Sequence, residues 1–518
     1  MEQERTKRVY DLHAWTGVVC GLFIYVVSLS GVFALFGDEL RTWEEQETRI
    51  AVARETAPVM PLLSAFVAET TKKGRLLDLS LNLPTGPEPF YLATALVKTA
   101  DGPVITEEQR WHPNAGTVLP LRTKGLSYWI VDFHRNLMLD RTLGRFLVAL
   151  SGIVLLVLIV SGLVMHRKIF QEIFTWRLSR SIRLKWQDSH KTIAVWGLPC
   201  HLMFAFTGAW LGLVIIFVPI TAMISFKGDT GALIEAVLGP QPQPTGISAR
   251  MFSIDEARDR AYVHVGIRPD SVSISLWGDE KAKYRFRYPP SRALISHAWI
   301  DISATTGRII DARLTDKPGL TFRVNPAMTT LHYGQFGGLW IKFLYVVLGI
   351  SLCLITATGL MIWLERRLQG SDARVFIRAL SRTTVGVCAG MGLASFAIFF
   401  ADKLLPDSAQ NRISVIGITY FGVWAAAVLY ALLRRNEYRT CKELFAATAV
   451  LAAGLPALNY IVTGDHVLSL LRAGHGYAAG VDIAGIATGI VLLLASIWIP
   501  ADRLTRYADC KPVAAKRP

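Results

Sequence analysis

The chain has 518 residues and a formal net charge of +15. Only 18% of its residues are charged, while 52% are hydrophobic. A soluble chain usually devotes about a quarter of its residues to charges, so this balance excludes an ordinary soluble enzyme, a disordered protein and a small disulfide-stabilised secreted protein.

Long apolar runs account for the missing charge. A helix that crosses a bilayer needs about 20 predominantly apolar residues. Eight runs approach or exceed that length, namely 14–36, 143–166, 193–218, 339–364, 384–401, 414–433, 444–463 and 481–499. The sequence therefore predicts a mostly α-helical, polytopic membrane protein with eight spans.

The spacing of these runs predicts the domain organisation. Two long polar stretches separate the first span from the second and the third from the fourth, while the other connections are short. The predicted parts are the N-terminus with the first span (1–36), a first outer domain (37–142), the second and third spans with their loop (143–226), a second outer domain (227–337), the fourth span with its loop (338–383) and the last four spans with the tail (384–518).

The Lys and Arg residues predict the orientation. The segments on one side of the spans hold 24 of them, and the two short loops on the other side, 402–413 and 464–480, hold three. Cytoplasmic loops carry the excess of Lys and Arg, so both termini are expected in the cytoplasm and both large domains outside. Because the Lys and Arg residues are concentrated on one side of the spans, the positive net charge does not indicate nucleic-acid binding.

Each outer stretch reads as a small α+β unit. In the second, Ser253 precedes an acidic and then apolar helical pattern that ends near Ala261, which is typical of an N-capped helix. Alternating residues elsewhere predict strands. The expected elements are a helix over 60–73 with strands at 76–83 and 90–99, and the Ser253 helix with strands near 271–277, 282–288, 297–302 and 308–314.

The first four spans contain an internal repeat. His13 and His190 each precede the Gly of a Ser/Thr-Gly pair by 18 residues. His134 and His332 precede the Gly of the next such pair by 28 and 27 residues. Parallel repeats of this kind pack about an axis normal to the membrane and place functional sites at their interface. The four-span core is thus duplicated, and the last four spans lie outside the repeat.

The repeat yields two matched histidine pairs. His13 and His190 stand at the cytoplasmic ends of spans one and three, and His134 and His332 precede spans two and four on the outer side. Ionisable groups at membrane depth are costly and indicate function. Imidazole is an axial ligand of haem iron. We therefore expect each pair to bind one b-type haem, giving an electron path between the two faces.

Two histidines break the symmetry. His166 ends span two and His201 lies eleven residues beyond His190. The sequence leaves three roles open for them: binding a third haem, replacing His13 or His190 as ligand, or forming a proton or quinone site. Arg135 is a candidate partner for an outer haem propionate. The candidate propionate partners on the cytoplasmic side are Arg167, Lys168 and Lys191. Their presence is also explained by the general excess of Lys and Arg in cytoplasmic segments.

These residues together resemble the PepSY-associated transmembrane family, and the similarity covers roughly residues 5–370. The likeness is carried by Leu12-His13-x-Trp15-x-Gly17, Phe133-His134-Arg135-Asn136-Leu137, His166-Arg167-Lys168 through Phe174-Thr-Trp-Arg177, Asp188-Ser-His190-Lys191, Gly197-Leu-Pro199-Cys-His201, Thr207-Gly208 and Leu331-His332-Tyr333-Gly334.

The resemblance implies that the outer domains are PepSY-like and that the protein sits in the inner membrane of a Gram-negative bacterium. Family members include reductases that release iron from ferric siderophores in the periplasm, using b-type haems held by histidines. The resemblance implies an oxidoreductase for iron acquisition with periplasmic iron-uptake partners. No Gly-rich dinucleotide fingerprint follows a predicted strand, so a quinol or a separate reductase is expected to supply the electrons.

Two other functions remain open at this stage. The four additional spans and His201 would suit a carrier for a siderophore, a metal or protons, although the spans are almost free of Asp and Glu. A regulatory or interaction module is the third possibility, because PepSY-like domains are also associated with restraining proteases.

Overall fold

The computed structural model describes residues 2–53, 56–86, 88–100, 102–121, 124–166, 182–238, 242–289, 298–313, 320–334, 336–368, 375–434 and 436–499. The chain divides into two compact units. The first, here called the helical unit, comprises Met1–Glu44, Thr123–Gly212 and Phe343–Pro518. The second, the sheet unit, comprises Glu45–Arg122 and Leu213–Lys342.

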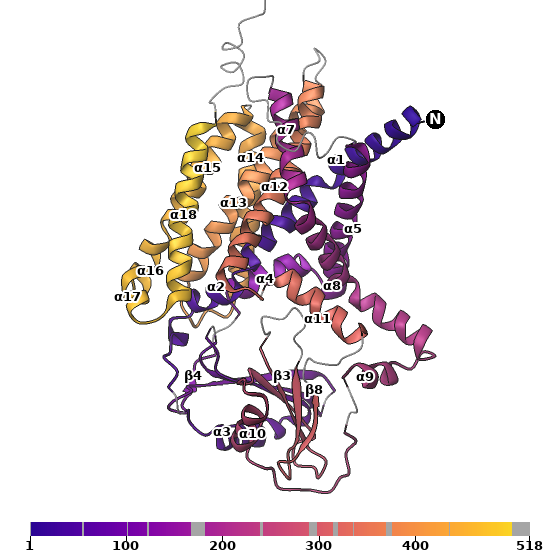
Figure 1. The fold of residues 1–518 in the computed structure, drawn as a ribbon. Helices are drawn as coiled ribbons and strands as arrows, with labels where there is room; N and C mark the ends of the chain where they lie inside the picture. Colours follow the sequence, from indigo (N-terminus) through magenta and orange to yellow (C-terminus); the bar gives the residue numbers. More distant parts are fainter. Residues whose placement is uncertain are drawn as a thin grey trace, which may run out of the picture. The chain divides into compact units, whose positions relative to one another are not determined.

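Long apolar helices dominate the helical unit (Figure 1). Among the described residues, seven helices are long and apolar enough to cross a membrane, or eight spans if one bent pair counts as a span. The seven are α1 (Glu2–Ala34), α5 (Arg141–Met165), α12 (Gly338–Leu368), α13 (Val375–Leu404), α14 (Arg412–Arg434), α15 (Glu437–Ala453) continued by α16 (Leu455–Thr463), and α18 (Gly476–Trp498).

The third predicted span is wrong as one continuous helix over 193–218. The structure has α7 (Ile182–Trp196) and α8 (Leu198–Ser225), bent by 71° at Gly197. Pro199 explains the break, because its ring has no N–H to donate and clashes with the carbonyl four residues earlier. Helical hydrogen bonding resumes after the bend, where the carbonyl of Gly197 accepts from the backbone N–H of His201 at 2.8 Å.

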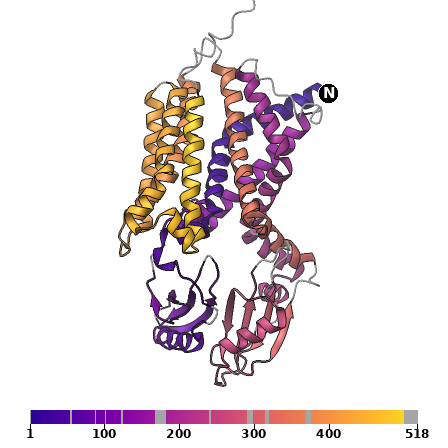
Figure 2. The ribbon, with the colours of Figure 1, turned by 60° about the vertical axis from the view of Figure 1, so that its left-hand side comes forward.

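Two short helices pack at the end of the unit where α1 finishes. They are α2 (Gly37–Glu44) and α4 (Leu126–Asn136), and α4 contacts α1, α2 and α5. We call this end the far end, and the end at which α1 begins the amino-terminal end. Helices α13, α14, α15 and α18 pack on one another, with the short α17 (Val467–Arg472) beside α18 (Figure 2).

The sheet unit is built on one antiparallel sheet of eight strands in the order β4-β3-β2-β1-β5-β6-β7-β8. Its other described elements are a 3-10 turn (Gln46–Thr48) and the helices α3 (Val59–Thr71), α9 (Thr230–Leu238), α10 (Ile254–Val265) and α11 (Leu320–Tyr333). The strands are β1 (Gly74–Asn82), β2 (Tyr91–Thr99), β3 (Val104–Trp111), β4 (Val118–Leu119), β5 (Ser271–Ser275), β6 (Lys283–Arg287), β7 (Trp299–Ser303) and β8 (Ile309–Arg313).

The two predicted outer stretches share this sheet. Strands β1 to β4 come from the first and β5 to β8 from the second, and they join where β1 pairs with β5, with Leu79 opposite Ile274. Alternate residues of β2, of β5 and of the second half of β1 are buried in one hydrophobic cluster together with residues of α3 and α10. This alternation is typical of an antiparallel sheet that packs one face against a hydrophobic core.

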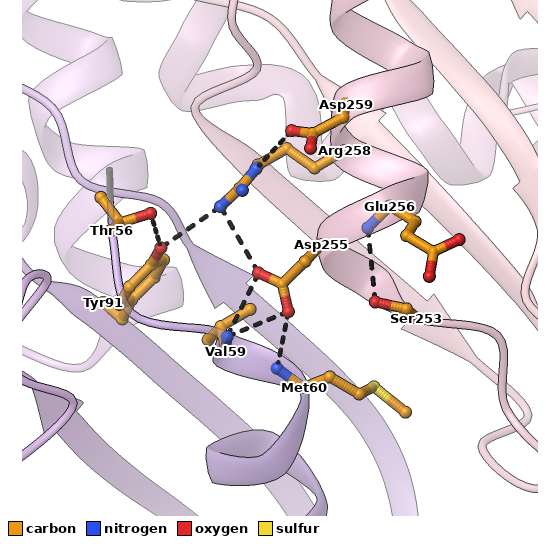
Figure 3. Close-up of polar contacts among 9 residues, drawn as sticks. All are labelled: Thr56, Val59, Met60, Tyr91, Ser253, Asp255, Glu256, Arg258 and Asp259. Atoms are coloured by element: carbon orange, nitrogen blue, oxygen red, sulfur yellow. Dashed lines mark hydrogen bonds and ion pairs between the residues drawn. The ribbon is translucent and has the colours of Figure 1, made fainter. Parts of the chain in front are cut away.

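A polar contact also joins the two halves of the sheet unit (Figure 3). The N-cap predicted at Ser253 is confirmed, since its Oγ accepts from the backbone N–H of Glu256 at 3.4 Å. Two residues later, Asp255 of α10 accepts from the backbone N–H groups of Val59 and Met60 at 3.0 Å each. A carboxylate thus satisfies the first N–H groups of α3, the helix of the other half.

Candidate functional site

His13 of α1 and His190 of α7 meet inside the helical unit. Their ring centres lie 6.4 Å apart and their ring planes are nearly perpendicular, at 86°. The bend at Gly197 leaves His190 on α7, in a helix separate from His201 on α8. The duplicated halves therefore bring their equivalent histidines together.

One nitrogen of the His13 ring is held by α5. Nδ1 lies 3.1 Å from the carbonyl oxygen of Leu158 and 3.0 Å from Oγ of Ser161. A carbonyl only accepts hydrogen bonds, so Nδ1 carries the proton and Nε2 keeps its lone pair. Metal-binding histidines are typically oriented in this way by a bond from the other ring nitrogen.

His190 is held by α12 in the same manner. Its Nδ1 lies 3.0 Å from the carbonyl oxygen of Ile355 and 3.3 Å from Oγ1 of Thr358. Thr358 in turn donates to the carbonyl of Leu354 at 2.7 Å, which leaves its oxygen to accept from the ring. Both rings of the pair therefore present an unprotonated Nε2.

A third histidine repeats the arrangement at the far end of the unit. His134 of α4 places Nδ1 3.1 Å from the carbonyl oxygen of Val27 and 3.2 Å from Oγ of Ser30, both on α1. Burial lowers the pKa of His134 to about 4, so its ring is neutral at physiological pH. Neutral imidazole is the form that binds metals.

A glycine follows each of these hydroxyl residues and lies against the ring. A Cβ atom would stand 3.4 Å from Cε1 of His13 at Gly162, 3.2 Å from Cε1 of His190 at Gly359 and 2.9 Å from Cε1 of His134 at Gly31. Three of the four Ser/Thr-Gly pairs seen in the sequence thus accommodate a histidine ring: the hydroxyl is bonded to the ring and the glycine leaves room for it.

We expect Gly31→Ala to destabilise the protein by about 1–3 kcal/mol, because the new methyl group overlaps a ring that two hydrogen bonds hold in place. Thermal unfolding in detergent measures the effect. Gly422→Ala on α14 is the matched control: a Cβ there meets nothing within 4 Å, so it should gain the helix-propensity benefit of alanine. Equal stability of the two variants would contradict the close fit of the His134 ring at Gly31.

The ring of His201 is hydrogen-bonded through Nε2, whereas the other three rings are hydrogen-bonded through Nδ1. Its side chain is buried and Nε2 lies 2.8 Å from Oγ of Ser351. Ser351 already donates to the carbonyl of Leu348 at 2.7 Å, so its oxygen accepts and Nε2 of His201 carries the proton. His201 is therefore not equivalent to His13 or His190 as a ligand. His166 follows the last residue of α5, with its backbone N–H bonded to the carbonyl of Leu163 at 3.1 Å.

The other residues predicted for the site lie in several different elements. His332 lies in α11, in the sheet unit, whereas His134 belongs to the helical unit, and their pairing stays a prediction. Arg135 is exposed at the end of α4. Nζ of Lys191 lies 3.9 Å from the buried carboxylate of Asp188. Arg167 and Lys168 fall outside the described residues.

The geometry of the first pair suits a single iron between two imidazoles. With metal–imidazole bonds of about 2 Å and a ring radius of roughly 1 Å, two axial imidazoles would have ring centres about 6 Å apart. The observed separation is 6.4 Å. Within the described ranges, no group of three or more His, Cys, Asp and Glu side chains is arranged to hold a bare metal ion. The residues fit haem iron better than a protein-ligated metal.

A family model described as the PepSY-associated TM region matches residues 10–366. The chain belongs to this family. It is accordingly a membrane protein, as its long apolar helices indicate. The matched region contains all six histidines discussed above and ends within α12, so α13 and the helices after it lie beyond the match.

The chain is also similar to an uncharacterised protein of Pseudomonas aeruginosa. The two are 30% identical over 386 residues, which cover 72% of this chain and 94% of the relative.

Proposed function

We propose that this PepSY-associated membrane protein binds b-type haem and carries electrons to a ferric siderophore or another ferric chelate. The observation that carries the proposal is the His13–His190 pair, whose rings are 6.4 Å apart and each anchored through Nδ1. A haem bound between them would supply a one-electron centre close to the amino-terminal end of the spans.

The chain's own residues prepare this site in two ways. Ser161 on α5 and Thr358 on α12 fix the protonated nitrogen of each ring, so each Nε2 is available without a change of tautomer. The glycines at 162 and 359 leave the space that the rings occupy. Such anchoring tunes ligand basicity and is a usual means of setting a potential.

A second haem site is proposed at the opposite face, with His134 as one ligand and His332 as the expected other. The anchoring of His134 on Val27 and Ser30 supports the first half of this assignment. The pairing with His332 rests on the sequence repeat alone. Arg135, which is exposed beside His134, is the proposed partner of a propionate.

The proposed topology follows the positive-inside pattern of the sequence. Both termini lie in the cytoplasm of a bacterium, the spans lie in its inner membrane, and the sheet unit lies in the periplasm, where a ferric chelate docks. Electrons enter from a quinol or a separate reductase. Reduction loosens the chelate, because Fe²⁺ has a lower charge and is softer than Fe³⁺ and suits hard oxygen ligands less well.

The decisive experiment is a pyridine haemochrome assay on the purified full-length protein from haem-sufficient cells. We expect a b-type spectrum and two haems per chain; a count of three would assign a further haem to His166 or His201. Dithionite-reduced protein should lose its reduced spectrum when a ferric hydroxamate chelate is added. A colourless preparation would overturn the proposal, and uptake activity in that haem-free protein would favour a carrier instead.

A further inference from the structure

Helices α13 to α18 lie beyond the region shared with the family, and they pack against helices of the core. Contacts of the described residues join α13 and α14 to α4, α18 to α2, and α13 to α1. Helices α2 and α4 are the two short helices at the far end, and α4 carries His134. The additional spans therefore contact the segment that presents one of the candidate ligands.

The first link runs from α2 into the additional spans. Trp43 is fully buried, and its Nε1 donates to Oδ1 of Asp482 on α18 at 2.7 Å. The other carboxylate oxygen accepts from Asn459 on α16 at 3.0 Å. Lys403 of α13 donates to the carbonyl of Trp43 at 2.6 Å and lies 4.4 Å from the centre of its ring. Two of the additional helices, α18 and α13, thus contact Trp43 of α2, and α16 holds the carboxylate that binds its indole N–H.

The second link runs from α2 to the start of α4. The N-cap residue Gly125 provides no side-chain cap, and Glu44 takes that role by accepting from the backbone N–H of Ser127 at 2.9 Å and from its Oγ at 2.6 Å. A Cβ on Gly125 would lie 3.1 Å from Oε2 of Glu44 and 3.2 Å from Oδ1 of Asp402 on α13. A carboxylate at a helix start satisfies free N–H groups and the helix dipole.

The third link is aromatic. Trp129 and Phe133 of α4 stack with ring centres 5.1 Å apart. Tyr420 of α14 lies 4.6 Å from the first ring and 5.1 Å from the second. Phe421 is more distant, at 6.2 Å from the first ring and 6.0 Å from the second. Large aromatic side chains contribute much of the packing energy where they are buried. The next residue after Phe133 is His134, whose ring is bonded to α1.

From these links we infer that the additional spans position α4 and thereby set the orientation of His134, with Trp43 and Asp482 as positioning residues. A helix of eleven residues is marginal by itself and needs the contacts on both sides. The inference rests on the proposed function insofar as His134 is a haem ligand, while the positioning of α4 is testable without haem.

The test uses the full-length protein with Trp43→Phe, which keeps an aromatic ring but removes the N–H that reaches Asp482. Hydrogen exchange of the peptide covering 126–136 should become faster, and one of the haem midpoint potentials should shift while the other stays in place. Tyr430→Phe is the control, because it removes a hydrogen bond of 2.5 Å to Glu443 between α14 and α15 and keeps the aromatic ring, while the residues that link the additional spans to α2 and α4 stay unchanged.

The outcomes separate the two proposals. Unchanged exchange of 126–136 in Trp43→Phe, or an equal change in both variants, overturns the positioning role. Faster exchange in Trp43→Phe alone, in a protein that binds no haem, supports the positioning of α4 and contradicts the haem proposal. Ser127→Ala, which removes the hydroxyl bond to Glu44, serves if Trp43→Phe does not fold, and the same exchange change is expected from it.

Discussion

His190→Ala should remove one haem per chain and leave the other. The variant deletes one of two imidazoles whose centres are 6.4 Å apart, and His201 does not present a free Nε2 to replace it, since that nitrogen is bonded to Ser351. We expect the pyridine haemochrome assay to report half the wild-type haem content, and reduction of a ferric chelate by quinol to fall at least a hundredfold because the electron path is interrupted.

His201→Ala and His264→Ala are the controls for His190→Ala. His201 is buried, but its Nε2, the nitrogen that would have to bind iron, is bonded to Ser351. His264 lies in the last turn of α10 in the sheet unit. Both variants should keep two haems per chain. If His190→Ala retained the full haem content, or if His201→Ala lost the same haem, the assignment of His13 and His190 as a ligand pair would be wrong.

Asp402→Ala should cause a large loss of stability in the helical unit. Asp402 and Arg412 are both fully buried, and their charged groups are 2.9 Å apart. Removing one partner of a buried ion pair leaves an uncompensated charge, which typically costs about 3–5 kcal/mol. Thermal unfolding in detergent, followed by circular dichroism, measures the loss.

The same arginine provides the control for Asp402→Ala. Asp407 lies 3.8 Å from Arg412, but its side chain is 70% exposed, so Asp407→Ala should leave the unfolding temperature nearly unchanged. The double change Asp402→Leu with Arg412→Met should recover most of the loss, because no isolated charge is left behind. A Asp402→Ala variant as stable as Asp407→Ala would show that the buried pair contributes little.

Several features of the fold could be predicted because their signals are local. A spanning helix must satisfy its own backbone hydrogen bonds and match the bilayer thickness, so each span appears as an apolar run. The cap at Ser253 is visible in a few residues for the same reason. The single miss among the spans, the bend at Gly197, also had a local signal in Pro199, which the hydropathy pattern hides.

The candidate site was only partly predictable. The spacing of His13, His190 and their Ser/Thr-Gly pairs suggested a repeat, but it did not indicate which histidine each pair would contact. The structure shows that His13 rests on Ser161 of α5 while Ser30 of α1 holds His134. Which helix faces which histidine depends on packing between helices more than 100 residues apart, and no local pattern specifies it.

The sequence by itself determined the membrane class and predicted the repeated histidines as candidate haem ligands, because hydropathy, charge and ligand type are properties of individual residues and short segments. Only the tertiary structure decided that the outer stretches share one sheet, and that the last helices are attached to α2. The Trp43–Asp482 bond joins residues 439 positions apart. Such a contact forms only when packing brings a buried donor to a buried acceptor, since neither can be left unpaired without cost.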